Sequence, residues 1–237
     1  ISAIKNLSLL KSLDLGNWPD FDKSFSTNGI VDISSLSGLR SLVELRMEHC
    51  KYLINIEPLA NLSSLANLEI SYCSSISDLN PLSGLARLSV LKLKSCSSVT
   101  NIDALSGLTA LKELNLNECS ALADVNALSK LTSLTMLYLN NCKLLTDINS
   151  FSSLVSLKEL VLGGCERITS LSTLHCLTGL KKLDISNLKR LRTTQTLQEI
   201  RPLVALEELN SPFHPALVAE ILAHTAACRQ DLKKISQ

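Results

Sequence analysis

Apolar residues recur on a fixed grid through the middle of the chain. From Leu39 a 23-residue unit repeats six times, with apolar residues at its positions 1, 4, 7, 9, 12, 15, 18 and 21. The alternation at positions 7 and 9 predicts a short strand, for example at Leu45–Met47. Apolar residues at every third position afterwards predict a tight 3₁₀-like turn instead of a full α-helix. Each unit is therefore expected to hold one strand and one return segment.

A cysteine occupies the same position in six successive units. These residues stand 23 positions apart, and Leu188 continues their row: Cys50, Cys73, Cys96, Cys119, Cys142 and Cys165. A period of about 20 to 29 residues with an L-x-x-L-x-L core is the leucine-rich repeat signature. The sequence therefore predicts an α/β solenoid, a leucine-rich repeat horseshoe of about nine 23-residue repeats. A parallel sheet is expected on its concave face, and 3₁₀ or irregular turns on its convex face.

An amide or carboxylate residue follows each of the first five cysteines of the row at a fixed distance. These residues stand just before a core residue: Asn55, Asp78, Asn101, Asp124 and Asp147. Their side chains hydrogen-bond nearby backbone groups, so they favour turns. We expect each of them to begin the return to the convex face.

The first repeat departs from the grid. Residues 1–211 are expected to form the solenoid, and the extra residues of the first coil make an insertion loop at 17–29. This loop carries Trp18, Phe21 and Phe25. Its aromatic residues either shield the open N-terminal coil from water or take part in recognition.

A helical cap is predicted for residues 212–237. The repeat grid stops after Ser211, and Pro215 is well placed as a first helical residue. Apolar residues then recur at helical spacing: Leu217, Val218, Ile221, Leu222, Leu232 and Ile235. Their apolar face is expected to cover the final coil, because the end of a solenoid otherwise exposes its core.

Composition narrows the class of protein. The chain is 46% hydrophobic with a formal net charge of +1. No apolar run approaches the roughly 18 residues that a membrane span needs, so no membrane span is expected. A net charge near zero argues against a chain built mainly to hold nucleic acid or an anionic membrane surface.

The cysteine row is expected to be a packing feature. Core leucines flank each cysteine, so the thiols should point inward as small apolar groups and weak donors. The distance between adjacent coils would allow a disulfide, whereas a metal site has little support because no C-x-x-C occurs. Reduced thiols fit an intracellular protein, and the compartment stays open.

Catalytic and cofactor motifs are absent from the sequence. No G-x-x-x-x-G-K-[ST], G-x-G-x-x-G or H-E-x-x-H occurs, and the four histidines are scattered. We therefore expect no enzyme activity, no cofactor, no metal and no small-molecule substrate.

The outward residues of each strand, and the two residues after it, are not dictated by the core. They are predicted to form a partner-binding surface on the concave face: Glu44, Arg46, Glu48, His49, Glu69, Tyr72, Lys92, Lys94, Asn115 and Tyr138. Their mixed charges suit a protein surface of alternating polarity, with Arg46, Tyr72 and Tyr138 as anchors. The alternative is a merely solvated face, because outward strand residues must be polar in any case.

A basic cluster crowds the eighth repeat, and its members are expected to share one edge of the solenoid. It consists of Lys181, Lys182, Lys189, Arg190 and Arg192. In an RNA-containing assembly such a rim would meet phosphates. A solvated rim is the alternative, because no aromatic platform accompanies the cations.

The segment Ile76-Ser-Asp-Leu-Asn-Pro-Leu-Ser-Gly-Leu85 and its following leucines and Cys96 resemble the cysteine-containing leucine-rich repeats of trypanosomatid proteins. That group includes the expression-site-associated family and adenylate cyclase regulatory-like proteins. The leucine spacing is also similar to that of internalin repeats. The resemblance covers roughly residues 30–188 and implies a non-catalytic protein that binds other proteins through its concave face. Most of the cysteines lack a preceding glycine and no RING-type cysteine cluster occurs, so ubiquitin-ligase chemistry does not carry over.

The sequence thus predicts a non-catalytic interaction scaffold that binds a protein partner through its concave face. The alternative is a structural subunit of a large ribonucleoprotein or cytoskeletal assembly. Such a subunit would dock through the basic C-terminal rim or the N-terminal loop.

Overall fold

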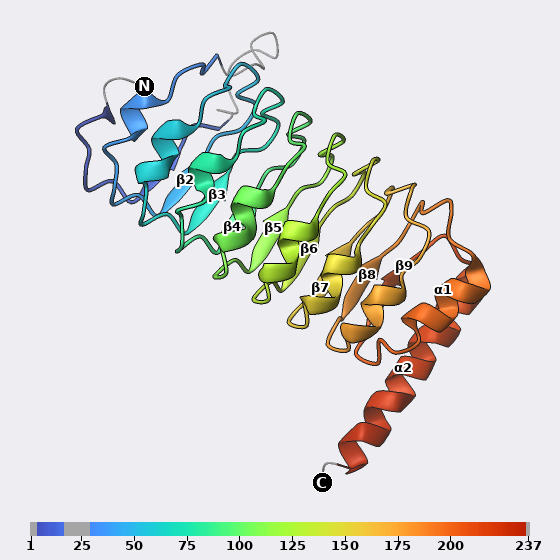
Figure 1. The fold of residues 1–237 in the computed structure, drawn as a ribbon. Helices are drawn as coiled ribbons and strands as arrows, with labels where there is room; N and C mark the ends of the chain where they lie inside the picture. The colour runs from blue at the N-terminus through green and yellow to red at the C-terminus, as the bar shows by residue number, and fades with distance from the viewer. Residues whose placement is uncertain (1–3, 17–28, 236–237) are drawn as a thin grey trace.

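The computed structural model describes residues 4–16 and 29–235, with side chains as far as residue 230. The chain winds into a solenoid whose coils carry strands on one face and short turns on the other (Figure 1). The aromatic residues predicted for the insertion loop, Trp18, Phe21 and Phe25, lie outside the described residues. Within the described part of the chain, no helix is long and apolar enough to cross a membrane.

Nine parallel strands make up one sheet in the described ranges, and they lie in sequence order. Between β2 and β8 each residue pairs with the residue 23 positions later, as Leu45 does with Leu68. The strands are β1 (Ser12–Asp14), β2 (Glu44–Arg46), β3 (Asn67–Glu69), β4 (Val90–Lys92), β5 (Glu113–Asn115), β6 (Met136–Tyr138), β7 (Glu159–Val161), β8 (Lys182–Asp184) and β9 (Glu208–Asn210). This register follows from the constant repeat length, and the predicted leucine-rich repeat solenoid with its parallel sheet is confirmed.

The opposite, convex face carries short 3₁₀ helices, as the apolar spacing predicts. They are η3 (Ser34–Leu36), η4 (Glu57–Asn61), η5 (Asn80–Leu82), η6 (Asp103–Gly107), η7 (Asn126–Lys130), η8 (Asn149–Ser153) and η9 (Ser172–Cys176). The predicted turn residues start them: Asp78 accepts a hydrogen bond from the Asn80 amide at 2.8 Å. Asp147 accepts one from the Asn149 amide at 2.7 Å. The Asn or Asp that follows each of the first five cysteines of the row therefore sets where the chain turns.

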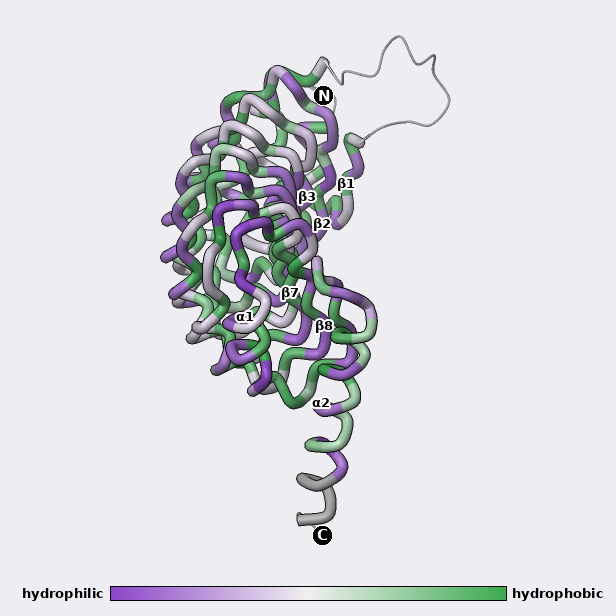
Figure 2. The backbone as a smooth tube through the Cα atoms, turned by 90° about the vertical axis from the view of Figure 1, so that its right-hand side faces the viewer, coloured by the Kyte–Doolittle hydropathy of each residue, from purple (hydrophilic) through white to green (hydrophobic). Residues whose placement is uncertain are grey.

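The core is one continuous column of grid residues. In the fifth strand's repeat Leu111, Leu114, Leu116 and Cys119 are completely buried. Burying one such leucine contributes about 1.5–3 kcal/mol before chain entropy is subtracted. Figure 2 looks along the solenoid and shows strands on one side of the superposed coils and turns on the other. Neighbouring coils bury one another's apolar residues, so stability is shared between repeats.

The cysteines tie each coil to the one before it. The thiol of Cys96 donates to the Ile70 carbonyl at 3.0 Å, and that of Cys119 to the Leu93 carbonyl at 3.2 Å. Cys142 and Cys165 repeat the contact, each with the carbonyl 26 residues earlier. Burial raises the pKa of Cys96 to about 11 and that of Cys119 to about 12. The prediction of inward-pointing cysteines acting as weak donors is confirmed.

The eighth repeat differs from the prediction. Its return segment contains an α-helix, α1 (Thr193–Ile200), where the grid predicts a 3₁₀ or irregular turn. Strand β9 follows β8 by 26 residues, so this unit is three residues longer than the others and has room for the helix. Glu199 fixes α1 to the preceding coil, because its carboxylate accepts from the Ser170 hydroxyl and the Leu171 amide, both at 2.7 Å.

The predicted C-terminal helix is present as α2 (Pro215–Ile235). Its N-terminal half lies against the last coil, where Phe213, Ile221 and Leu222 pack on the core. The buried hydroxyl of Thr225 donates to the Leu206 carbonyl at 3.0 Å. Figure 1 shows α2 leaving the end of the sheet at an angle.

Candidate partner-binding surface

The short strands present two columns of side chains on the concave face. The middle residue of each of β2 to β8 is a buried leucine, such as Leu45 or Leu91, so the first and third residues face outward. The third residues of successive strands form one column across the sheet: Asp14, Arg46, Glu69, Lys92, Asn115 and Tyr138. Five of these six residues are among those predicted for the partner-binding surface, and the register places them side by side.

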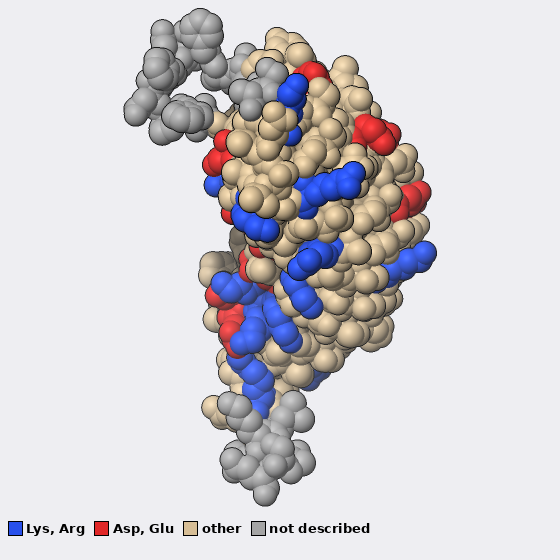
Figure 3. Space-filling model, turned by 90° about the vertical axis from the view of Figure 1, so that its left-hand side faces the viewer, with Lys and Arg blue, Asp and Glu red and all other residues tan. Residues whose placement is uncertain are grey.

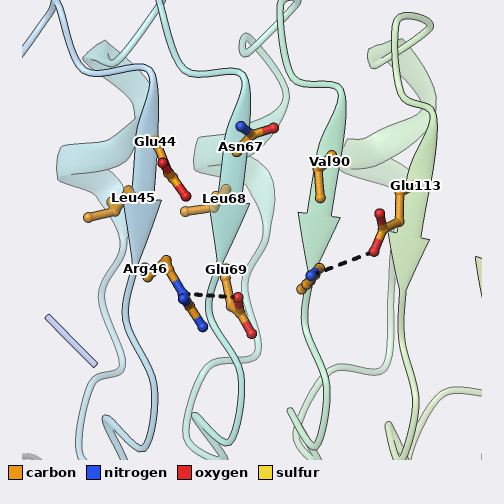
Figure 4. Close-up of a pocket in the computed structure, with 9 residues that line it drawn as sticks. Glu44, Leu45, Arg46, Asn67, Leu68, Glu69, Val90 and Glu113 are labelled. Carbon is orange, nitrogen blue, oxygen red and sulfur yellow. Dashed lines mark ion pairs between the residues drawn. The ribbon is translucent and has the colours of Figure 1, made fainter. Parts of the chain in front are cut away.

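The N-terminal half of this face is hollowed. A hollow of about 320 Å³ lies over strands β2 to β5. Its polar lining comes from Glu44, Arg46, Glu69, Lys92 and Glu113 (Figure 4). Opposite charges therefore alternate across the floor of the hollow.

Arg46 lies at the centre of an acidic group. Its guanidinium reaches Glu48 at 3.0 Å, Glu69 at 3.3 Å and Asp14 at 4.0 Å. Hydrogen bonding to Glu48 and the nearby charge of Glu69 raise the pKa of Arg46. Burial raises the pKa of Glu69, against the attraction of Arg46. Arg46 is thus fixed by its own chain, and a partner would meet a pre-formed network instead of a free cation.

Tyr72 is enclosed on both sides by side chains of neighbouring coils. His49 stacks on its ring with centroids 4.5 Å apart and 6° between the planes. The Lys94 ammonium lies 5.1 Å from the centroid of the same ring. Contact with the Tyr72 side chain, followed by the charge of Glu118, raises the pKa of Lys94. This stack leaves the edge of the Tyr72 ring as the part that a partner can contact.

The residue before each of the six cysteines of the row, and before Leu188 that continues it, adopts a left-handed backbone conformation, which the sequence interpretation does not anticipate. This column has φ between 56° and 76° and comprises His49, Tyr72, Ser95, Glu118, Asn141, Gly164 and Asn187. Asn and Gly tolerate this conformation, whereas a tyrosine there is unusual. The signal in the sequence is the recurrence of Asn and Gly in the later repeats. Tyr72 occupies a position that disfavours its residue type.

The column of third residues is uncharged over β5 to β7, where it consists of Asn115, Tyr138 and Val161. Tyr138 is partly buried, and burial together with the charges of Glu159 and Glu113 raises its pKa to about 12. The side-chain oxygen of Asn115 accepts from the Asn117 amide at 3.0 Å. Tyr138 therefore stays neutral and presents a hydroxyl beside a row of amides.

The basic residues of the eighth repeat do not share one edge, contrary to the expectation. Lys181 and Lys182 stand where the chain enters β8, whereas Lys189, Arg190 and Arg192 follow the strand on the opposite edge. The three-residue strand separates the two groups. Lysines of both groups are also paired with carboxylates: Lys181 with Glu207 at 3.2 Å, Lys182 with Glu208 at 2.9 Å and Lys189 with Glu166 at 3.0 Å.

The described residues contain no group of three or more His, Cys, Asp and Glu side chains placed to hold a metal ion. The charged residues of the concave face instead form ion pairs across coils, such as Lys92 with Glu113 at 3.7 Å and Lys94 with Glu118 at 3.7 Å. The arrangement suits recognition by charge and shape.

Comparison with protein families identifies the architecture. The model described as "BspA type Leucine rich repeat region (6 copies)" matches residues 21–146, which is more than half of the chain. A second, described as "Leucine Rich repeats (2 copies)", matches residues 132–174. The chain is a leucine-rich repeat protein. Such proteins are commonly non-catalytic interaction scaffolds that bind protein partners.

Solved structures resemble this leucine-rich repeat protein as well. Internalin C2 of Listeria monocytogenes is 31% identical, covers 63% of this chain and has a TM-score of 0.53. The repeat domain of the type III effector XopL is 24% identical over 88% of this chain and 71% of its own, with a TM-score of 0.60. A Leptospira interrogans repeat protein is 22% identical over 75% of this chain and 45% of its own, with a TM-score of 0.58. The latter two likenesses show the fold alone.

The match with internalin C2 is partial, because this leucine-rich repeat protein spans 64% of the internalin C2 chain. A search among curated proteins found no match.

Proposed function

We propose that this leucine-rich repeat protein is a non-catalytic scaffold that binds a protein partner through its concave face. The observation that carries the proposal is the column of alternating charges over β1 to β4, three members of which line a hollow of about 320 Å³. A fixed array of both charges, with few side chains left to order on binding, favours a protein surface of complementary polarity.

The contact residues proposed are those of the concave face and the turn that follows it. Arg46, Glu69 and Lys92 form the floor of the hollow, and Glu44 lies at its margin. The other proposed contacts are Glu48, His49, Tyr72, Lys94, Asn115 and Tyr138. Tyr72 contributes the edge of its ring, because His49 stacks on the ring and the Lys94 ammonium lies over it.

The proposal also includes the domain bounds and the family group of the chain. Residues 1–211 act as the solenoid, with the insertion at 17–29, and residues 212–237 act as its C-terminal cap. The trypanosomatid repeats remain the proposed family group within the leucine-rich repeat proteins, on the strength of the sequence resemblance alone. The contribution of Trp18, Phe21 and Phe25 to binding remains a prediction.

A photo-crosslinking experiment tests the concave face. A crosslinking amino acid replaces Glu69 in one variant and Arg87, an exposed residue off the concave face, in a matched variant. Crosslinked partners from the native host cells are identified by mass spectrometry. We expect one dominant adduct from position 69 and none of the same mass from position 87.

Charge reversal then separates specific binding of the partner from nonspecific crosslinking. With the purified partner, Arg46→Glu combined with Lys92→Glu should weaken binding at least about tenfold, because it breaks the alternation of charge in the hollow. Arg87→Glu combined with Lys130→Glu gives the same change in net charge on exposed residues elsewhere and should leave the affinity within about twofold. Equal losses in both double variants would contradict the proposal.

A further inference from the structure

One edge of the solenoid carries cations almost without acids. The edge consists of the segments that lead from each 3₁₀ helix into the next strand: 37–43, 62–66, 83–89, 108–112, 131–135, 154–158 and 177–181. We call it the strand-entry edge. Its charged residues are Arg40, Arg87, Lys112, Lys158 and Lys181, all exposed, and these segments contain no Asp or Glu. Lys11 continues the row before β1. The strand-entry edge is therefore positively charged although the net charge of the whole chain is only +1.

Four of these five cations differ from those of the concave face in their pairing, whereas Lys181 is paired with Glu207 at 3.2 Å. Arg46, Lys92, Lys94 and Lys182 each have a carboxylate within ion-pair distance. For Arg40, Arg87, Lys112 and Lys158 no ion pair occurs among the described residues. Lys158 instead donates to the Gly179 carbonyl at 3.3 Å. The strand-entry edge thus has positive charge that its own chain does not neutralise.

Exposed aliphatic side chains interrupt the cations on the same edge. Val155 is 59% exposed and Val43 is 37% exposed. Leu9, in the corresponding segment before β1, is 82% exposed. The uncharged polar residues between them are mainly Ser and Thr. Figure 3 shows Lys and Arg side chains in a band along the length of the molecule, with most Asp and Glu to either side of it.

We propose that the strand-entry edge docks on an anionic membrane surface. Adjacent coils of the stack lie about 4.8 Å apart, so the cations of successive coils form a band that one extended surface can meet. Anionic headgroups attract each cation near the surface, and the aliphatic tips enter the boundary between headgroups and acyl chains. Nucleic acid would leave those aliphatic tips unused, and the edge offers no aromatic ring for stacking on bases. The partner that fits this edge is therefore the lipid surface.

Vesicle flotation tests this directly. The full chain is mixed with vesicles of phosphatidylcholine and phosphatidylserine in a ratio of about 7:3, or of phosphatidylcholine alone, at about 20 mM and about 300 mM salt. We expect binding to the anionic vesicles at low salt, at least about tenfold weaker binding at high salt, and none to the neutral vesicles.

Matched variants locate the contact. Arg87→Glu, Lys112→Glu and Lys158→Glu together should reduce partition at least about tenfold. Lys51→Glu, Lys143→Glu and Arg167→Glu change the net charge equally on the opposite edge and should reduce it no more than about threefold. Leu9→Ser with Val155→Ser should lower partition severalfold at unchanged charge. Circular dichroism verifies that each variant is folded.

Three results would overturn the proposal. One is equal binding to neutral and anionic vesicles, and another is an equal loss in the two triple variants. The third is tighter binding of an RNA duplex than of the vesicles at the same salt, abolished by the Arg87, Lys112 and Lys158 reversals, which would make the edge a nucleic-acid surface. None of these variants changes the concave face, so the test is independent of the proposed partner site.

Discussion

The imidazole of His49 lies flat against the phenol ring of Tyr72, 4.5 Å away and 6° from parallel. Both residues have a left-handed backbone, with φ near 60°. Such a conformation costs a bulky residue about 1–2 kcal/mol, and an aromatic stack returns about 0.5–1.5 kcal/mol. The stack therefore offsets part of the backbone strain of the two residues and holds both side chains at the margin of the concave face.

Substitution of Tyr72 separates the two effects. Tyr72→Asn relieves the backbone while losing the stack, so the free energy of unfolding should change by less than about 1 kcal/mol. Tyr72→Val loses the stack and keeps a β-branched residue in the left-handed region, so it should cost about 2 kcal/mol or more. Urea denaturation followed by circular dichroism measures both.

Tyr52 provides the control for this pair. It is 54% exposed and does not belong to the left-handed column. Both Tyr52→Asn and Tyr52→Val should stay within about 0.5 kcal/mol of the original chain. If Tyr72→Asn and Tyr72→Val destabilise equally, backbone strain is not what distinguishes this position.

The buried thiols predict a loss of stability in alkali. Burial raises the pKa of Cys96 to about 11 and that of Cys119 to about 12, from an ordinary value of 9.0. The unfolded chain releases these protons first, so the stabilisation is complete below pH 9 and is lost as pH rises through 11 to 12. The melting temperature should fall steeply over that interval.

A variant without one thiol tests the cause of that fall. Cys119→Ala should cost about 1–2 kcal/mol at neutral pH through lost packing and a lost weak donor. Its melting temperature should also decline less steeply between pH 9 and pH 12 than that of the original chain. An unchanged slope would mean that other groups, such as Tyr138, govern the alkaline transition.

Glu199 should be the main link between α1 and the coil that contains η9. Glu199→Gln removes the charge that strengthens two hydrogen bonds of 2.7 Å, to Ser170 and Leu171. We expect a loss of about 1–2 kcal/mol, and faster hydrogen exchange confined to residues 193–200. Gln198→Ala, at an exposed position of the same helix, is the control. It should leave the hydrogen exchange of residues 193–200 unchanged.

Removal of α2 tests the cap. Truncation after Ser211 uncovers the last coil, where Phe213, Ile221 and Leu222 otherwise lie against the core. The shortened chain should self-associate at concentrations where the full chain does not, as measured by analytical ultracentrifugation. A truncated chain that stays folded and monomeric would show that the last coil needs no cover.

Much of the fold follows from the repeat length alone. A constant 23-residue period places Leu45, Leu68 and Leu91 in register, so strands, turns and the cysteine row can be predicted without any tertiary information. The helix α1 escapes this reasoning because its three extra residues break the period, and its threonines favour a helix only weakly.

Side-chain pairing was much harder to predict than the backbone. The three carboxylates around Arg46 come from two neighbouring coils and its own, and no local pattern specifies which of them the guanidinium approaches. The strand-entry edge does not stand out in the sequence, for a different reason. Its cations, such as Arg40 and Arg87, are isolated in the sequence, and only the stacking of coils brings them into one band.

The cysteine-to-carbonyl contacts have a consequence for how such a chain can change over generations. Each thiol reaches a carbonyl 26 residues back, one coil and three residues away, and the same bond recurs from Cys96 to Cys165. Duplicating or deleting one whole 23-residue unit would therefore rejoin equivalent partners and leave each such bond intact. Unequal recombination between repeats can lengthen or shorten the concave surface in whole steps, so its reach can be inherited as a variable trait while the fold is conserved.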